Sequence, residues 1–321
     1  MSQLDLFGAP PPNTVEPAEN SPLRTPLAEE AASRFPGLYL GTSSWSFSGW
    51  QELVYRDSYA QTELARTGLI AYAQMPLFRT VSLDRTYYRP MEEAEFKFLS
   101  SQVSPHFRFV VKAPRDLLKP TDGGLDLVSF LARFLTPAAR GLGDKLGVIL
   151  LQFPPKTNAD FNGRFVEALG PFLRGLPRGL HYSVEIRDAD LLGPELAETL
   201  SQARISLCGS IHSALPNPDQ QLLTVPPAPG TPMVFRWNIR PSLGYEEARS
   251  KFQPFNRILS EDTARRSLLV KIVSRALKAG RQVYLTANNK AEGCAPLTLL
   301  KFLEELASGV TDASSNTMVP E

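Results

Sequence analysis

Eight short runs of β-branched and aromatic residues recur along this chain, and most of them are followed by a longer segment with helical spacing. The runs are Leu38–Trp45, Phe78–Asp84, Phe107–Ala113, Leu146–Phe153, His181–Arg187, Arg204–Ile211, Met233–Ile239 and Gln282–Asn289. Alternating strands and helices are typical of a parallel sheet with crossover helices. Eight strands close a barrel, so we predict an α/β fold of the (β/α)8 TIM type. A doubly wound open sheet is the structural alternative.

The segments between and beyond these runs define the predicted organisation. Helical candidates include Leu125–Leu135, Asn162–Leu173, Thr263–Ala279 and Pro296–Leu306. The proline-rich segment Pro216–Pro232 is predicted to be a long loop, because proline interrupts helices. Residues 1–35 are rich in Pro, Glu, Ala and Ser and are predicted to be a disordered tail. The predicted barrel covers residues 36–307, and residues 308–321 form a second predicted tail.

Composition excludes several classes of protein. With 43% hydrophobic residues, the 321-residue chain can bury a large core. The 34 basic and 33 acidic residues leave no global field that attracts nucleic acid or an anionic membrane. Two distant cysteines, Cys208 and Cys294, fit a reducing compartment better than a disulfide framework. The sequence shows neither a membrane-spanning stretch nor a secretion signal, so we expect a cytoplasmic protein without membrane contact.

Several motifs at the strand ends resemble the YecE-like family, also called domain of unknown function 72. The matching blocks are Gly41–Trp50, Thr80–Val81 with Thr86–Pro90, Phe109–Lys112, Leu146–Gly147 with Leu151–Pro155, Val184–Arg187, and Asn288–Asn289 with Gly293, Ala295 and Pro296. They occur in family order over nearly the whole predicted barrel. The resemblance implies a (β/α)8 barrel and no assigned reaction. A distant likeness to sugar isomerases and metal-dependent apurinic endonucleases is an analogy of fold only.

The chain also departs from the family pattern at positions that bear on chemistry. Ser82 and Asp84 stand where the family usually has an acidic residue and an asparagine. Asp188 replaces a common histidine, and Asn238-Ile239 replaces a usual His-Gly pair after the matching Arg236. A reaction that needs those family residues is therefore lost or altered in this chain.

Polar side chains at the C-terminal ends of the strands form the predicted site, because this face carries function in barrels of this type. Side chains alternate along a strand, so inward positions from several strands converge at one rim. The predicted catalytic residues are Glu185, Lys112 and Asp84; the predicted ligand-binding residues are Arg187, Arg236, Asn238, Gln152, Asn288 and Asn289, with Trp45 and Tyr88 as apolar or stacking walls.

The charges of this set point to an anionic ligand. Arginine offers a planar fork for phosphate or carboxylate, and lysine offers a point charge. Glu185 is the predicted general base, because a partly desolvated carboxylate can be tuned toward neutral pH. The structural alternative is a set of ion pairs, with Lys112 against Glu185 and Arg187 against Asp84 or Asp188.

The sequence gives weaker evidence for a metal site. His106 precedes one predicted strand and His181 begins another, so both belong to the opposite face. His212 alone is then left near the mouth, which disfavours a zinc cluster. A magnesium ion held by the carboxylates of the mouth stays open but has no motif behind it. No metal ligand or other cofactor is therefore assigned.

The first residues contain a short recognition motif. Gln3-Leu4-Asp5-Leu6-Phe7 resembles the peptide with which bacterial replication and repair proteins bind the DNA polymerase sliding clamp. Leu6 and Phe7 would enter an apolar pocket while Gln3 binds at its rim. A tether of this kind would keep the barrel near DNA at high effective concentration.

Three hypotheses for function follow. The first is a hydrolase acting on phosphate esters or nucleic acid, with Glu185 as base. The second is a non-catalytic, clamp-tethered protein that binds an anionic ligand. The third is a sugar-phosphate isomerase or lyase, with the terminal motif accidental. Ser82 and the missing histidines favour the second hypothesis over the first.

Overall fold

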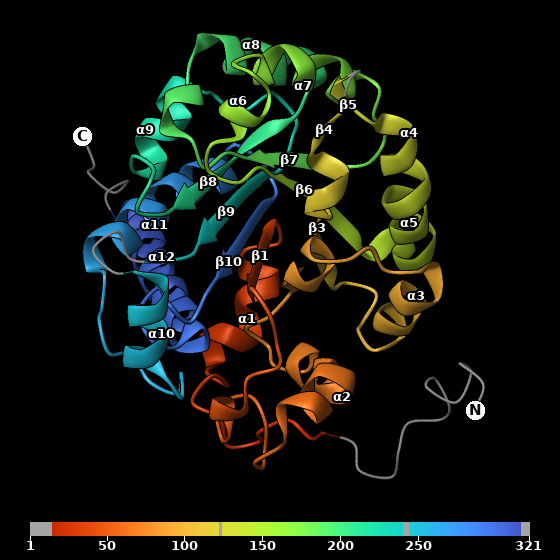
Figure 1. Ribbon diagram of the computed structural model, residues 1–321. Coiled ribbons are helices and arrows are strands. Elements are labelled where there is room, and N and C mark those ends of the chain that lie inside the picture. Colours follow the sequence, from red (N-terminus) through yellow and green to blue (C-terminus); the bar gives the residue numbers. More distant parts are fainter. Residues whose placement is uncertain (1–14, 122–123, 240–243, 316–321) are drawn as a thin grey trace, which may run out of the picture.

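The computed structural model describes residues 15–121, 124–239 and 244–315 of the chain. Its centre is a closed barrel of parallel strands with helices around it (Figure 1). The barrel strands are β1 (Leu38–Thr42), β2 (Thr80–Leu83), β3 (Arg108–Lys112), β6 (Leu146–Gln152), β7 (Tyr182–Glu185), β8 (Ser206–Ile211), β9 (Met233–Trp237) and β10 (Val283–Ala287). Because β1 pairs with both β2 and β10, the sheet closes on itself. The predicted barrel is confirmed, and the open doubly wound sheet is excluded.

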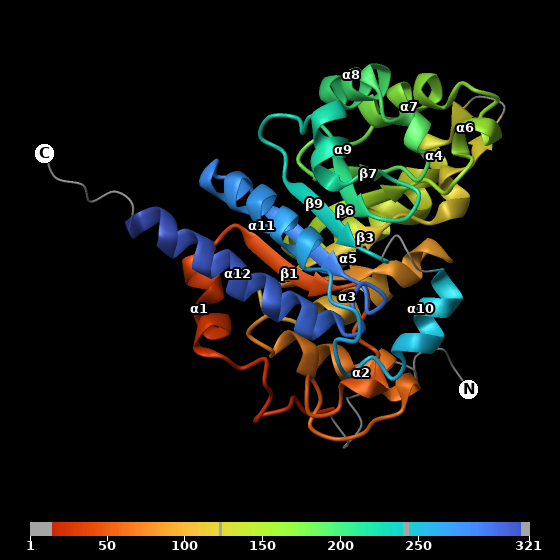
Figure 2. The same cartoon turned by 90° about the vertical axis from the view of Figure 1, so that its left-hand side faces the viewer.

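Helices cover the outside of the barrel and fill its connections (Figures 1 and 2). They include α1 (Pro26–Arg34), α2 (Gln61–Ala73), α3 (Glu93–Ser101), α4 (Leu127–Phe130), α5 (Thr136–Leu142), α6 (Thr157–Asp160), α7 (Phe165–Arg174), α8 (Pro194–Ala203), α9 (Pro218–Thr224), α10 (Tyr245–Phe252), α11 (Thr263–Lys278) and α12 (Ala295–Ser315). A small antiparallel pair, β4 (Pro120–Thr121) and β5 (Gly124–Leu125), lies in the connection after β3. Single turns of 3₁₀ or π helix lie at Ser48–Trp50, Asp84–Tyr87, Arg115–Leu118, Leu131–Leu135, Gly143–Lys145 and Ala189–Leu191.

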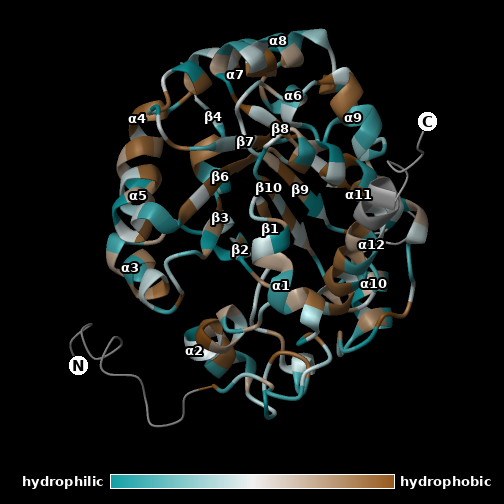
Figure 3. Ribbon diagram, turned by 180° about the vertical axis from the view of Figure 1, so that it is seen from behind, coloured by the Kyte–Doolittle hydropathy of each residue, from teal (hydrophilic) through white to brown (hydrophobic). Residues whose placement is uncertain are grey.

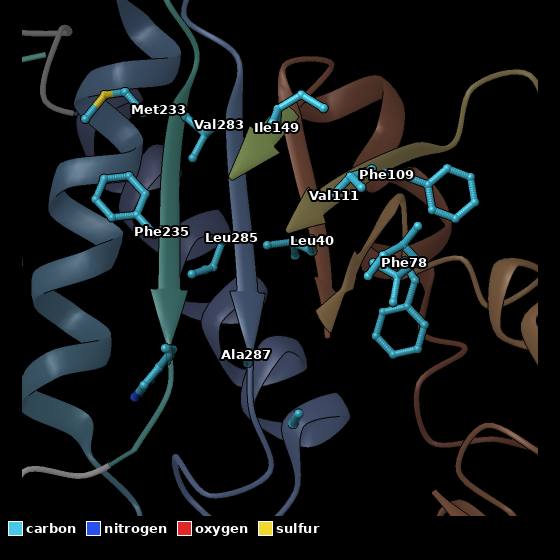
Figure 4. Close-up of a cluster of buried hydrophobic side chains, with 14 of the residues drawn as sticks. Leu40, Phe78, Phe109, Val111, Ile149, Met233, Phe235, Val283, Leu285 and Ala287 are labelled. Carbon is cyan, nitrogen blue, oxygen red and sulfur yellow. The ribbon is translucent and has the colours of Figure 1, made fainter. Parts of the chain in front are cut away.

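The larger part of the core lies between the strands and the surrounding helices. Outward-facing strand residues such as Leu40, Val111 and Leu285 are buried there (Figure 4). Hydrophobic segments recur on the helices of the ring, where they alternate with hydrophilic ones (Figure 3). Each fully buried Leu, Val or Phe contributes about 1.5–3 kcal/mol through the removal of apolar surface from water. This layer therefore fixes the barrel on which the strand ends are mounted.

The inside of the barrel has a smaller core whose side chains alternate with the outer layer. Its buried members are Tyr39, Val110, Val148, Leu150, Cys208, Val234 and Tyr284. The rings of Tyr39 and Tyr284 stack with centroids 4.6 Å apart. Because side chains repeat every second residue, the residues two positions beyond Val110, Leu150, Cys208 and Val234 also point inward, one layer closer to the C-terminal ends. An apolar floor thus lies beneath a polar layer.

The N-terminal segment is more ordered than its composition indicates. Val15 and Leu23 are buried, and Ala18 N donates to Val54 O (3.0 Å) in the loop after β1. Helix α1 begins at Pro26, and Thr25 caps it by accepting a hydrogen bond from Ala28 N (3.1 Å). Proline suits the first turn of a helix, whose N–H groups have no partner within the helix. The predicted disordered tail of residues 1–35 is therefore wrong for residues 15–35, and residues 1–14 lie outside the described part.

Two further boundaries differ from the prediction. The segment Pro216–Pro232 contains helix α9, because Pro218 occupies its first turn and Asn217 caps it. At the C-terminal end, α12 extends to Ser315, so the helix continues past the predicted boundary at 308. Composition led to the wrong prediction for both segments. Proline and small polar residues disfavour the middle of a helix but are common at its ends. No helix in the described ranges is long and apolar enough to cross a bilayer.

Candidate functional site

The polar layer at the mouth of the barrel comes from neighbouring strands in register. Gln152 pairs with Glu185 between β6 and β7, and Ser210 pairs with Arg236 between β8 and β9. Lys112 is the last residue of β3. All five side chains are buried at the end of the barrel that receives the connecting loops. The sequence prediction that Lys112, Glu185 and Arg236 meet at one rim agrees with this arrangement.

Glu185 is the centre of the layer. Its carboxylate is fully buried and lies 2.5 Å from Arg187 Nη2 and 2.9 Å from Arg236 Nη1. The hydroxyl of Ser210 also donates to it at 3.0 Å. Burial by itself raises the pKa of this carboxyl, but the charges of Arg187, Arg236 and Lys112 outweigh burial and hold the pKa at about 2. Glu185 is therefore an ionised anchor for two guanidinium groups.

Arg236 has partners for both of its terminal nitrogens, while its buried Nε has none among the described residues. Its Nη1 donates to Glu185 and to Gln152 Oε1 at 3.2 Å, and its Nη2 donates to Asp84 Oδ2 at 2.8 Å. Asp84 also accepts a hydrogen bond from Ser82 Oγ at 2.6 Å. The side chain of Arg236 is only 3% exposed. Both of its terminal nitrogens are thus committed to the protein, so this arginine organises the layer from below.

Arg187 differs from Arg236 in having a terminal nitrogen without a partner. Its Nη2 binds Glu185, whereas its Nη1 is buried and has no hydrogen-bond partner among the described residues. The side chain is 8% exposed and lines a cavity of about 550 Å³. The other lining residues are Pro155, Lys156, Asn158, Ala159, Gly163, Asp188, Ala189, Asp190, Leu191 and Ala214. A buried N–H without a partner costs about 1–3 kcal/mol, so this position is suited to an added acceptor.

Lys112 lies at the end of β3, where the charges of Asp84, Glu185, Arg236 and Arg187 act on it. Its ammonium is 3.9 Å from the centroid of the Tyr87 ring, and its residue is only 7% exposed. Burial lowers the pKa of this amine to about 8, although the nearby carboxylates of Asp84 and Glu185 oppose the shift. A cation over an aromatic face is held weakly and keeps its reactive nitrogen at the mouth. Sequence reasoning named Tyr88 as a wall, but Tyr87 is the ring that covers Lys112.

Asn238 and Ser210 extend the network toward α9. Asn238 Nδ2 donates to Ser210 Oγ at 2.8 Å and lies 3.5 Å from Glu185 Oε1. Gln221 of α9 accepts from Ser210 N at 3.0 Å and donates to Ser210 O at 2.7 Å. Ser210 and Gln221 were missed from the sequence. Alternation with Cys208 would have pointed to Ser210, whereas Gln221 had no signal because its segment was predicted as a loop.

Other predicted ligand-binding residues have structural partners. Asn288 Nδ2 donates to Ser43 Oγ at 2.9 Å, and Asn289 Oδ1 accepts from Ala295 N at 2.8 Å, at the start of α12. Trp45 is buried, and its Nε1 donates to Leu64 O at 2.8 Å. Tyr88 is 73% exposed and packs against the edge of its neighbour Tyr87. These four residues shape loops around the mouth, and none of them makes a hydrogen bond to the polar layer within the described part of the chain.

The predicted alternative of ion pairs has the wrong partners. Arg187 pairs with Glu185 rather than with Asp84 or Asp188, and Lys112 has no ion pair in the described part of the chain. Asp188 instead accepts from the backbone N of Lys156 at 2.6 Å. The ionic layer exists, but it is centred on the two arginines.

Histidine and cysteine side chains add little to the chemistry of the mouth. Burial, helped by the charge of Arg187, lowers the pKa of His212 to about 4, so this ring is neutral at pH 7. Both Cys208 and Cys294 are buried, and burial raises the pKa of Cys294 to about 12. Among the described residues, no three His, Cys, Asp or Glu side chains converge in a way that could hold a metal ion.

Comparison with known proteins identifies the family. The family model described as "Protein of unknown function DUF72" matches residues 39–320. The chain belongs to the DUF72 family. The resemblance found in the strand-end motifs is thereby confirmed. No curated protein matches the chain.

Solved DUF72 structures have the same fold. A DUF72 family protein from Thermotoga maritima MSB8 is 22% identical with a TM-score of 0.59, covering 84% of this chain and 99% of its own. A DUF72 family protein from Enterococcus faecalis V583 is 18% identical with a TM-score of 0.59, covering 84% of this chain and 95% of its own. At these identities the likeness extends to the fold alone, so the role of the mouth rests on its own geometry.

Proposed function

We propose that the mouth of this DUF72 barrel binds a small phosphorylated ligand through Arg187. The observation that carries the proposal is the buried Nη1 of Arg187, which has no partner among the described residues and belongs to a residue lining the cavity. A guanidinium that already binds a carboxylate through one nitrogen can offer the other to a phosphate oxygen. The cavity volume of about 550 Å³ lies within the range of small-molecule sites.

The charge balance of the layer supports an anion. Within the polar layer, three cations, Lys112, Arg187 and Arg236, face two carboxylates, Glu185 and Asp84, which leaves one positive charge in excess there. The cavity beside the layer is lined by Lys156, Asp188 and Asp190 as well as Arg187. A buried excess charge is costly unless it is compensated. A phosphate group would supply the missing acceptor and the missing negative charge together.

The same geometry changes the role that we propose for Glu185. A carboxylate with a pKa of about 2 that is held by two arginines is a weak base. We therefore assign Glu185 to the positioning of Arg187 rather than to proton abstraction. Hydrolysis, non-catalytic binding, and isomerase or lyase chemistry all need the same anion site, and turnover assays separate them.

A binding experiment tests the anion site. Inorganic phosphate, ribose 5-phosphate and a single-stranded oligonucleotide are titrated into the full chain by isothermal calorimetry. We expect the sugar phosphate to bind at least tenfold more tightly than the oligonucleotide, and Arg187→Gln to weaken its binding at least tenfold. Arg275→Gln, on the exposed outer face of α11, is the matched control. Equal affinity of wild type and Arg187→Gln contradicts the proposal, and tighter binding of the oligonucleotide assigns the site to nucleic acid.

We also propose that Gln3–Phe7 binds the bacterial sliding clamp. These residues lie outside the described part, so the proposal rests on the motif and on where the described chain begins. Arg56 N donates to Glu16 O at 2.9 Å, which places the first described residues against the loop that follows β1.

Purified clamp provides the test of this second proposal. We expect the full chain to bind the clamp and the double variant Leu6→Ala/Phe7→Ala to bind at least tenfold more weakly. The double variant Pro11→Ala/Pro12→Ala, outside the motif, is the control for the segment. Affinity unchanged by the Leu6 and Phe7 replacements would rule out clamp binding through this motif and leave the anion site untouched.

A further inference from the structure

Lys112 is an amine placed at the mouth without a hydrogen-bond or ion-pair partner in the described part of the chain. Its Nζ lies 3.9 Å from the centroid of the Tyr87 ring, and it is reached by the fields of Asp84, Glu185, Arg187 and Arg236. A structural lysine at such depth ordinarily pairs with a carboxylate. Here both nearby carboxylates are already bound by arginines. The nitrogen is therefore available to a ligand.

The surroundings of Lys112 also favour its neutral form. Burial lowers the pKa to about 8, and the cations Arg236 and Arg187 act in the same direction, while Asp84 and Glu185 oppose them. Tyr87, the remaining group in contact, presents the face of its ring. At pH 7 about a tenth of such an amine is unprotonated, on the order of a hundredfold more than for an ordinary lysine. Neutral amines are the form that attacks carbonyl carbon.

We propose that Lys112 forms an imine with an aldehyde or ketone group of the ligand whose phosphate is held by Arg187. This inference rests on the proposed anion site and narrows its ligand to phosphorylated carbonyl compounds, such as the open-chain form of a sugar phosphate. The nitrogen lone pair forms a bond to the carbonyl carbon, and the resulting carbinolamine loses its oxygen as water. The two hydrogens of that water come from the amine, so no oxidant or reductant takes part.

Reductive trapping tests the imine on the full chain. The protein is incubated with glyceraldehyde 3-phosphate and sodium cyanoborohydride, and the stable secondary amine is located by peptide mass mapping. We expect Lys112 to be labelled at least tenfold faster at pH 7.5 than Lys271 and Lys278, which are exposed on the outside of α11. The labelling rate of Lys112 should rise with pH around a midpoint near 8. Labelling no faster than at Lys278 of the same molecules overturns the proposal, whether or not any variant folds.

Two further comparisons in the same experiment test the imine separately from the anion site. Unphosphorylated glyceraldehyde is compared with the phosphate, and Arg187→Gln with wild type. A phosphate preference of at least tenfold that Arg187→Gln removes supports both proposals. Equal labelling of Lys112 by the two aldehydes supports the imine and contradicts the anion site. Arg187-dependent binding of phosphate without labelling of Lys112 contradicts the imine and supports the anion site.

Discussion

Two buried arginine clusters of this barrel look alike but differ in their unused donors. At the mouth, Arg187 and Arg236 share Glu185. Outside the barrel wall, Arg266 of α11 binds Glu305 through Nε (3.1 Å), Glu292 through Nη1 (3.4 Å) and Glu261 through Nη2 (2.6 Å). The guanidinium of Arg266 has a carboxylate for each of its nitrogens, whereas that of Arg187 has a nitrogen without any.

The difference separates a structural cluster from a candidate site. Arg266 joins the start of α11 to α12 and to the loop after β10, and it does not need an added group. The polar layer of the mouth carries more cations than carboxylates, and Arg187 lines a cavity. Burial and ion pairing are similar in the two places, so neither of them marks a site. The proposed site is marked instead by the unpartnered Nη1 of a residue that lines a cavity.

The largest change in unfolding free energy is expected when the cluster around Arg266 is broken. Arg266→Met leaves the buried Glu292 without its cation, and breaking a buried ion pair costs about 3–5 kcal/mol. We expect the free energy of unfolding in urea to fall by that amount while phosphate affinity stays unchanged. Arg275→Met, on the exposed face of the same helix, should change stability by less than about 0.5 kcal/mol. A loss of phosphate binding in a folded Arg266→Met would erase the distinction between the clusters.

The pH dependence of unfolding tests the mouth next. The folded-state pKa of Glu185 is about 2, below its ordinary value of 4.5, so its stabilisation is present above pH 4.5 and is lost as the pH falls toward 2. The shift corresponds to about 3 kcal/mol. We expect the difference in unfolding free energy between wild type and Glu185→Gln to shrink by about 2.5 kcal/mol between pH 6 and pH 2.5, because the carboxyl is still partly ionised at pH 2.5. Glu167→Gln, exposed on α7, should show no such change.

Ligand binding at the mouth should raise the unfolding free energy of the protein by an amount similar to the pH effect at Glu185. At a concentration one hundred times its Kd, ribose 5-phosphate is expected to raise the unfolding free energy of wild type by about 2.7 kcal/mol. Arg187→Gln should not gain this stabilisation. Without ligand, the variant should be less stable than wild type, because it breaks the buried ion pair between Arg187 and Glu185, although Glu185 keeps Arg236. Thermal unfolding with and without the sugar phosphate measures both quantities.

The smallest expected effect is the pH dependence of stability due to Glu292, which has the opposite sign to that of Glu185. Burial raises the pKa of this carboxyl despite the charge of Arg266. Its contribution to stability is therefore full below its ordinary pKa and declines as the pH rises through the raised value. Glu292→Gln should consequently gain stability relative to wild type between pH 4 and pH 7, by less than Glu185→Gln changes in the acid range. Parallel pH dependence of the two variants would contradict the assigned directions.

Much of the site could be predicted from the alternation of side chains along the strands. Where the prediction failed, the cause can be identified. Lys112, Glu185 and Arg236 could be placed because inward positions at strand ends must meet in a closed barrel. Asn288 and Asn289 follow the last strand, where the path of the loop decides whether an amide side chain faces a ligand or caps backbone groups. Tyr87 and Tyr88 are adjacent on a short helix and point in different directions, which sequence spacing does not resolve.

The sequence by itself determined the barrel, the order of its strands and the family, because hydrophobic periodicity and motif order are properties of the chain. Only the tertiary structure decided that residues 15–35 pack against the barrel, and that both terminal nitrogens of Arg236 have partners whereas Nη1 of Arg187 has none. Whether a donor has a partner depends on differences of a few tenths of an ångström in the distances between side chains that are far apart in the sequence. Those distances exist only after the barrel closes and brings Asp84 and Glu185 to the same guanidinium.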